Sequence, residues 1–247
     1  MSYRLALASL LSTAAITTAF AAPAPSYSVQ FNSSYNQAAN PNLVFTDADV
    51  QADGLHTYYG SSGASTVSLS NALLSGSEYT VSLSFTGISR TDYTRKVLDF
   101  GGLTSDAGIY VNDGAIAFSN ATSSTHADVS GAAGVLAPFT SFNFTLTRSA
   151  ASNIVVGYVN GLEQFSFQDT AGQAVFSSAL KSIYILTDNN DGYEITPGVL
   201  KGINVYNTAL SPADFGGSIS AVPEPESYAL CLAGLMTLGY LMKRRRG

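Results

Sequence analysis

The sequence predicts an all-β protein built as a two-sheet antiparallel β-sandwich. Short segments that alternate apolar and polar residues recur along most of the chain, as half-buried strands require. Glycine- and asparagine-rich turns separate these segments, and Asn160-Gly161 is the strongest hairpin signal among them. Before Tyr228, only the first 21 residues show sustained helical periodicity. Many short strands separated by such turns favour two stacked sheets.

The clearest single strand covers Tyr79 to Phe85, where every second residue is a large apolar one. We expect strands at residues 27–31, 43–45, 55–59, 65–69, 79–85, 95–101, 107–111, 115–118, 142–146, 153–159, 163–167, 182–186 and 200–206. Residues 46–54 and 119–138 are expected to be polar loops. Residues 207–215 should close the domain with a short helical turn, because Ser211 suits a helix cap and Pro212 suits a first helical position.

The N-terminus has the pattern of a secretory signal peptide. Arg4 supplies a positive charge, residues 5–20 are uncharged, and small residues precede the expected cleavage after Ala21. Residues 1–21 are therefore predicted to be removed on export. A linker, residues 22–26, leads into the predicted sandwich domain, residues 27–217.

The C-terminal tail, residues 218–247, has three parts in a fixed order. The motif Pro223-Glu224-Pro225 lies within residues 222–227, an uncharged run follows at residues 228–242, and residues 243–246 are basic. As a helix the run is about 22 Å long, shorter than the ~30 Å hydrocarbon core, so it predicts a single short transmembrane helix. The basic end favours the cytoplasmic side, which places the domain outside.

This layout resembles the PEP-CTERM sorting signal of Gram-negative bacteria, which an exosortase is thought to recognise and cut. The resemblance covers the tail alone. It implies an exported protein that is held transiently in the inner membrane by its C-terminal helix. After processing, the product would reach the outer surface or the extracellular space.

Composition excludes several classes of function. Residues 22–222 hold six lysines and arginines against 15 aspartates and glutamates, a formal charge of −9, which argues against nucleic acid as a partner. The one cysteine, Cys231, lies in the tail, so the domain has no disulfide. The sequence has only two histidines, His56 and His126, which are 70 positions apart. This argues against a histidine-based zinc site and against a Ser-His-Asp triad.

Four segments of the domain carry a second resemblance. They are residues 79–85, residues 97–101, the Thr147-Arg148 pair leading to Tyr158-Val159-Asn160-Gly161, and residues 202–211 with the sequence GINVYNTALS. In this order they resemble the laminin G-like, concanavalin A-like jelly roll. The family often has a tryptophan before the Thr-Arg strand, where this chain has Phe142.

The segment from Asp188 to Glu194 is the densest group of candidate metal ligands. Asp188, Asn190, Asp191 and Glu194 offer oxygen atoms around a glycine, as a loop that binds a hard cation such as Ca²⁺ requires. Laminin G-like domains often hold Ca²⁺ on a rim loop, so the resemblance supports the same site. The alternative is an Asx-rich turn without metal, because Asn, Asp and Gly form turns by themselves. Three further aspartates in residues 46–54 either complete such a site or form a solvated acidic loop.

An enzyme on this fold would need paired carboxylates in a groove. The laminarinase-type relatives of this fold carry a Glu-x-Asp-x-x-Glu strand, which is absent here, so no catalytic residues are assigned. Four tyrosines on or beside polar loops could stack on a sugar, or they could be ordinary sandwich tyrosines: Tyr58, Tyr59, Tyr93 and Tyr193. The basic cluster of Arg90, Arg95 and Lys96 is interpreted as a solvated strand edge.

The sequence thus predicts an exported, non-enzymatic surface or extracellular protein with a laminin G-like binding or structural domain. Its expected partners are an exosortase-type sorting enzyme and glycans or other polymers of an exopolysaccharide or biofilm matrix. The alternative is a Ca²⁺-dependent lectin, and a glycan-active enzyme is a third hypothesis.

Overall fold

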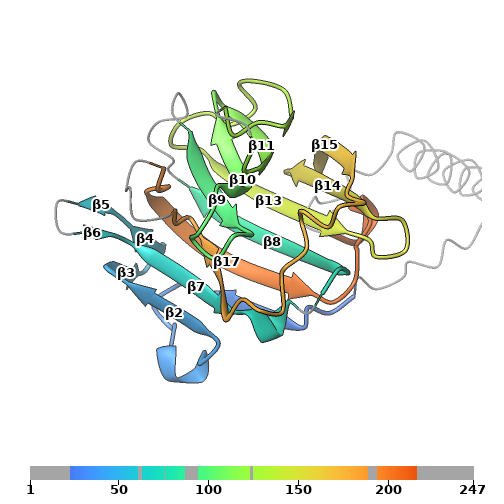
Figure 1. Ribbon diagram of the computed structural model, residues 1–247. Helices are drawn as coiled ribbons and strands as arrows, with labels where there is room; N and C mark the ends of the chain where they lie inside the picture. The colour runs from blue at the N-terminus through green and yellow to red at the C-terminus, as the bar shows by residue number, and fades with distance from the viewer. Residues whose placement is uncertain are drawn as a thin grey trace, which may run out of the picture.

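The computed structural model (Figure 1) describes residues 23–60, 63–74, 76–86, 94–122, 125–188 and 194–215. Its strands pair antiparallel throughout and form two large sheets whose inner faces share one hydrophobic core. The predicted all-β, two-sheet antiparallel sandwich is therefore confirmed.

The larger sheet, sheet A, has the strand order β15-β14-β13-β8-β17-β4-β3, and β1 also pairs with β17. Its strands are β1 (Tyr27–Gln30), β3 (Ala48–Gln51), β4 (Gly54–Thr57), β8 (Tyr79–Thr86), β13 (Ser141–Arg148), β14 (Ile154–Val159), β15 (Leu162–Gln168) and β17 (Gly198–Tyr206). The central strand β8 buries Tyr79, Val81, Leu83 and Phe85, as its alternation predicts.

The second sheet, sheet B, has the order β12-β11-β10-β9-β16-β7-β2. Its strands are β2 (Leu43–Thr46), β7 (Thr66–Ser70), β9 (Arg95–Asp99), β10 (Ala107–Asn112), β11 (Ala115–Asn120), β12 (Val129–Ser130) and β16 (Ser182–Ile185). The remaining described elements are the hairpin β5 (Tyr59–Gly60) and β6 (Gly63–Ala64), the 3₁₀ turns η1 (Gln37–Ala39) and η2 (Asn71–Leu73), and the helical turn α1 (Pro212–Phe215).

Both hairpins that the turn residues indicate are present. Asp113 and Gly114 have φ of 50° and 71° between β10 and β11, and Asn160 and Gly161 have φ of 51° and 80° between β14 and β15. Positive φ at both central residues matches the right-handed twist of the strands, which is why Asn-Gly and Asp-Gly predict such turns.

Two segments that were expected to be loops contain strands. Residues 46–54 hold β3, whose Ala48 and Val50 are half-buried while Asp49 and Gln51 face solvent. The prediction was wrong here because aspartate is disfavoured in strands, whereas an edge strand tolerates it on the solvent face. Residues 119–138 hold the two-residue strand β12, which is too short to show a periodic pattern.

A buried ion pair ties the end of β13 to the segment after β15. Arg148 Nε lies 2.8 Å from Asp169 Oδ2, and both residues are 2% exposed. Arg148 also donates to Ser77 O at 2.6 Å, while Asp169 accepts from the backbone amide of Gln173. Because the partners satisfy one another, this pair can fasten the end of the sandwich without leaving an unpaired charge.

The predicted export and sorting segments lie outside the described residues. These are the signal peptide with its cleavage site at Ala21, and the tail with Pro223, Glu224, Pro225 and the short apolar run. Among the residues that the structure describes, no helix is long and apolar enough to cross a membrane.

Candidate metal centre

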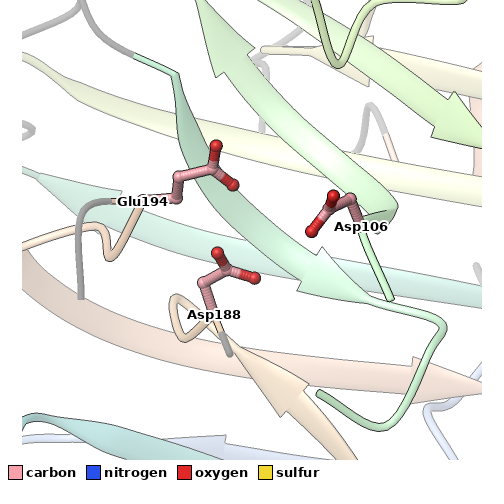
Figure 2. Close-up of side chains that lie close together, drawn as sticks. All are labelled: Asp106, Asp188 and Glu194. Carbon is pink, nitrogen blue, oxygen red and sulfur yellow. The ribbon is translucent and has the colours of Figure 1, made fainter. Parts of the chain in front are cut away.

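Three carboxylates from separate segments of the chain meet beside sheet B (Figure 2). Asp106 directly precedes β10, Asp188 follows β16, and Glu194 lies before β17. One oxygen atom from each side chain lies within 4.8 Å of the others. We call these three residues the acidic centre.

Strand β9 holds the three segments together through backbone hydrogen bonds. Lys96 N donates to Glu194 O at 2.7 Å, and Leu186 N donates to Val97 O at 3.0 Å. Phe100 N donates to Ala107 O at 2.9 Å, which fixes the start of β10 beside the end of β9. The acidic centre is therefore built by sheet pairing between residues that are distant in sequence.

The acidic centre lies beside the side of β10 that faces away from the hydrophobic core. Ile109 and Val111 belong to the core, so Tyr110 between them points to the opposite face of the sheet. The His126 ring stacks on the Tyr110 ring with centroids 4.9 Å apart, and His126 Nε2 lies 3.2 Å from Glu194 Oε1. These contacts place the two rings against the acidic centre.

A buried lysine already supplies one positive charge. Lys96 is fully buried, and its ammonium lies 2.5 Å from Asp188 Oδ1 and 3.2 Å from Asp99 Oδ2. It also donates to Ser105 O at 3.2 Å. The interpretation of Lys96 as part of a solvated strand edge was wrong, because pairing in the middle of sheet B buries it beneath the neighbouring loops.

Among the described residues, carboxylates outnumber ammonium groups around the acidic centre. The ammonium of Lys96 contacts Asp99 and Asp188, and the acidic centre adds the carboxylates of Asp106 and Glu194 beside Asp188. In the described part of the chain, five buried side-chain nitrogen or oxygen atoms have no hydrogen-bond partner, and four of them belong to this cluster: Tyr110 Oη, His126 Nδ1, Asp188 Oδ1 and Glu194 Oε2. Asp188 Oδ1 has its ion pair with Lys96, but the contact lacks hydrogen-bond geometry. Buried polar atoms without partners are rare, so their concentration here indicates a place for a further polar partner, a water molecule or an ion.

The protonation of Glu194 responds to this excess of negative charge. Burial, a hydrogen bond with Asp188 and the charges of Asp188 and Asp106 raise the pKa of Glu194 to about 7. Burial and the same carboxylates also raise the pKa of the Tyr110 hydroxyl. At neutral pH the centre therefore needs either a shared proton or a bound cation to offset its charge.

The residues present fit a hard divalent cation. Ca²⁺ prefers carboxylate oxygens at about 2.3–2.6 Å, so two ligands on opposite sides of the ion lie at most about 5 Å apart. The 4.8 Å limit on the three oxygens is compatible with that spacing. The three carboxylates supply part of the coordination shell that Ca²⁺ requires.

The structure brings together only some of the predicted ligands. Asp188 and Glu194 meet, whereas Asn190 and Asp191 lie outside the described residues. No local sequence pattern indicates Asp106 as a ligand, since it is 82 positions before Asp188. The carboxylates of residues 46–54 do not belong to the acidic centre, and Asp49 instead lies on sheet A.

Asp49 belongs to a separate polar surface on the β3–β4 hairpin. Its carboxylate accepts hydrogen bonds from Gln51 at 2.9 Å and from the Tyr58 hydroxyl at 3.1 Å. Tyr58 is 44% exposed and stacks on His56, with ring centroids 6.3 Å apart. Among the tyrosines named for sugar stacking, it is the one whose side chain the structure describes.

No family model and no curated protein matches the sequence. Solved structures do share the fold. One is domain 4 of AbnA, an extracellular arabinanase from Geobacillus stearothermophilus, which was solved with arabinotriose. Its sequence is 18% identical and the TM-score is 0.50. The match covers 71% of this chain and 86% of that domain. The binding domain of botulinum neurotoxin serotype D is 15% identical with a TM-score of 0.53, covering 81% of this chain and 52% of that one.

A sialidase from Trypanosoma rangeli is 14% identical with a TM-score of 0.52, and the match covers 70% of this chain but 28% of the enzyme. This chain therefore corresponds to about a quarter of that protein and to about half of the neurotoxin structure. At such identities the likeness establishes the β-sandwich fold.

Proposed function

We propose that this protein is an exported, non-enzymatic surface or extracellular protein whose sandwich domain contacts matrix polysaccharide and holds Ca²⁺ at the acidic centre. The observation that carries the proposal is the meeting of three carboxylates, those of Asp106, Asp188 and Glu194, of which Asp188 is paired with Lys96. A divalent cation among these oxygens offsets that charge and gives Glu194 Oε2, which has no hydrogen-bond partner, a ligand.

The role of the cation is to fasten loops of the domain. Asp106, Asp188 and Glu194 come from three segments, so one ion coordinated by all three links the connections before β10, after β16 and before β17. A ligand that binds the native state alone must raise the melting temperature. The test compares melting in millimolar Ca²⁺ with melting in chelator, and equal melting temperatures would refute a native-state Ca²⁺ site.

Contact with polysaccharide is supported by the fold and by the predicted destination. The arabinanase domain that shares the fold was solved with an oligosaccharide, and the tail of this chain resembles a sorting signal for export. Arabinotriose and a polysaccharide panel are the first probes. Binding of at least one polymer by the purified protein, without its hydrolysis, is the expected result.

A Ca²⁺-dependent lectin is the second candidate, and the partial exposure of Asp106 and Glu194 favours it. An ion bound at a partly open site can exchange a water for a sugar hydroxyl. In that case glycan binding disappears when the cation is chelated, whereas a purely structural ion leaves binding intact while the fold persists. Hydrolysis of the panel would instead support an enzyme.

Processing by an exosortase-type enzyme has its own test. Fractionation of the native host with C-terminal mass spectrometry should find a surface protein that has lost residues 243–246. An intact basic end on the mature surface protein would contradict sorting with cleavage.

A further inference from the structure

The solvent face of sheet A carries a row of side chains that crosses five neighbouring strands, β3, β4, β17, β8 and β13 (Figure 1). In order of cross-strand pairing its members are Asp49, His56, Val199, Thr86 and Ser141, which we call the sheet A row. Leu55, Leu200 and Phe85 are each next to a member in sequence and belong to the core, so the row faces away from the core. Every member of the row is exposed or partly exposed.

The Tyr58 ring lies at the β3 end of the sheet A row. Its hydroxyl donates to Asp49 Oδ2 at 3.1 Å and accepts from Gln51 Nε2 at 3.3 Å. The His56 ring lies beside it, with the centroids 6.3 Å apart. These contacts fix the orientation of Tyr58 outside the hydrophobic core, while the residue remains 44% exposed. A ring that is already ordered loses little side-chain entropy when a ligand stacks on it.

Two exposed carboxylates flank these rings. Gln51 and Tyr58 both donate to Oδ2 of Asp49, so among the described residues its Oδ1 accepts no hydrogen bond. Asp53 Oδ1 lies 2.8 Å from His56 Nε2. Hydrogen bonds from Gln51 and Tyr58 lower the pKa of Asp49, and a hydrogen bond from His56 lowers the pKa of Asp53. Both groups are therefore ionised acceptors at neutral pH.

The other end of the sheet A row offers hydroxyl groups. Thr86 Oγ1 and Ser141 Oγ are 2.5 Å apart, and Lys201 Nζ donates to Ser141 Oγ at 3.3 Å. Lys201 places one positive charge here, whereas the carboxylates of Asp49 and Asp53 lie at the Tyr58 end. A ligand that crosses the whole row meets charges of both signs, which favours a neutral chain with hydroxyl groups.

A sugar chain has the chemistry that this surface recognises. The C–H bonds on one face of a pyranose carry partial positive charge, and the face of an aromatic ring is negative. The hydroxyl groups on the edge of the sugar donate to carboxylate oxygens, which form stronger hydrogen bonds than neutral acceptors do. Neighbouring strands are about 4.8 Å apart, so a row across five strands spans about 19 Å, which is longer than one sugar unit.

We propose that the sheet A row binds a linear neutral polysaccharide that lies across the strands, with one pyranose ring stacked on Tyr58 and a hydroxyl of that ring donating to Asp49 Oδ1. The inference rests on the proposed function, since it assigns a place to the glycan contact. Asp49 is not part of the acidic centre, so sugar binding here does not depend on Ca²⁺.

Two substitutions test the Tyr58 end of the row. Tyr58→Ala removes the stacking surface, and Asp49→Ala removes the acceptor together with the partner of the Tyr58 hydroxyl. Both residues are exposed, so the variants should fold. Tyr184→Ala is the matched control, because Tyr184 is partly exposed on β16 of sheet B, between the core residues Ile183 and Ile185. Each full-length variant is checked for an unchanged melting temperature.

Binding is measured by isothermal titration with cello-, laminari- and manno-oligosaccharides of increasing length, both in Ca²⁺ and in chelator. At least one series should bind the wild type, with an affinity that rises with chain length until the oligosaccharide spans the row of about 19 Å. Tyr58→Ala and Asp49→Ala should each lose roughly tenfold or more in affinity, and Tyr184→Ala should lose none. Chelator should leave the wild-type affinity unchanged.

Oligolysine is the competing probe, since aromatic rings beside carboxylates also attract cations. Binding of oligolysine without binding of any oligosaccharide would overturn the proposal, as would equal oligosaccharide affinity in the wild type and in folded Tyr58→Ala. If Tyr58→Ala still binds a polysaccharide polymer as tightly as the wild type, the proposed function stands and only this site is removed. If the wild type binds neither oligosaccharides nor polymers, the proposed contact with polysaccharide fails as well.

Discussion

Lys96 Nζ lies 2.5 Å from Asp188 Oδ1, with exposed side-chain fractions of 0% and 3%. The pair joins β9 to the end of β16 at a place where water cannot screen either charge. Lys96 also contacts Asp99, so one ammonium is shared between two buried carboxylates. This arrangement connects the stability of sheet B to the charge of the acidic centre.

Replacing Lys96 by methionine should destabilise the protein strongly. The change keeps most of the side-chain volume but leaves two buried carboxylates without their cation, which costs about 3–5 kcal/mol when one partner of a buried pair is removed. Urea unfolding measures the loss. Lys181→Met is the control, because Lys181 is exposed and its replacement should stay within about 0.5 kcal/mol. A similar loss in the free energy of unfolding for Lys96→Met and Lys181→Met would contradict the buried ion pairs of Lys96.

Arg148→Met should destabilise the protein by a similar amount, because it breaks the buried ion pair with Asp169. It removes the partner of Asp169 and the hydrogen bond to Ser77 O, with an expected loss of about 3–5 kcal/mol. Asp169→Asn should be destabilising as well, because Gln173 N and Ala174 N donate to different oxygens of Asp169, of which asparagine keeps one, and because Arg148 loses its counter-charge. An Arg148→Met protein as stable as the wild type in urea would contradict the role of this pair.

The stability of the protein should depend on pH through the titration of Glu194. The pKa of Glu194 is raised to about 7 in the folded protein, from an ordinary value of 4.5. Between these values the folded form keeps a proton that the unfolded form has released, so this group makes the metal-free protein less stable as the pH rises through that window. Above about pH 7 both forms are ionised and the contribution levels off.

Glu194→Gln removes this titration. Urea unfolding of the metal-free protein from about pH 5 to pH 8 should therefore show a flatter profile for the variant than for the wild type. Because Ca²⁺ requires the ionised carboxylate, the affinity of the wild type for Ca²⁺ should rise with pH through the same range. Superimposable stability profiles would mean that Glu194 does not have a raised pKa.

Local patterns in the sequence predicted the strands well. The apolar residues at every second position of β8 and the Asp-Gly and Asn-Gly turns depend on backbone geometry within a few residues. Strand β3 was missed because its aspartate indicates a loop by propensity, and the pairing of β3 with β4 overrides that preference.

The acidic centre could be predicted only in part. Asp188 and Glu194 are close in sequence, and their residue types indicate a cation loop. Asp106 joins them because β9 pairs with both β10 and β16, and no local pattern specifies that sheet order. The burial of Lys96 has the same origin, since a lysine near the start of a strand is usually solvated.

Isothermal titration of the metal-free protein with Ca²⁺ tests the central claim most directly. One Ca²⁺ should bind per chain, and the binding heat should disappear in Asp106→Asn and in Glu194→Gln. Asp113→Asn is the matched control, because Asp113 is exposed in the β10–β11 turn, where asparagine tolerates the same positive φ. Absence of Ca²⁺ binding by the wild type, or equal binding by folded Asp106→Asn and Asp113→Asn proteins, would contradict the claim.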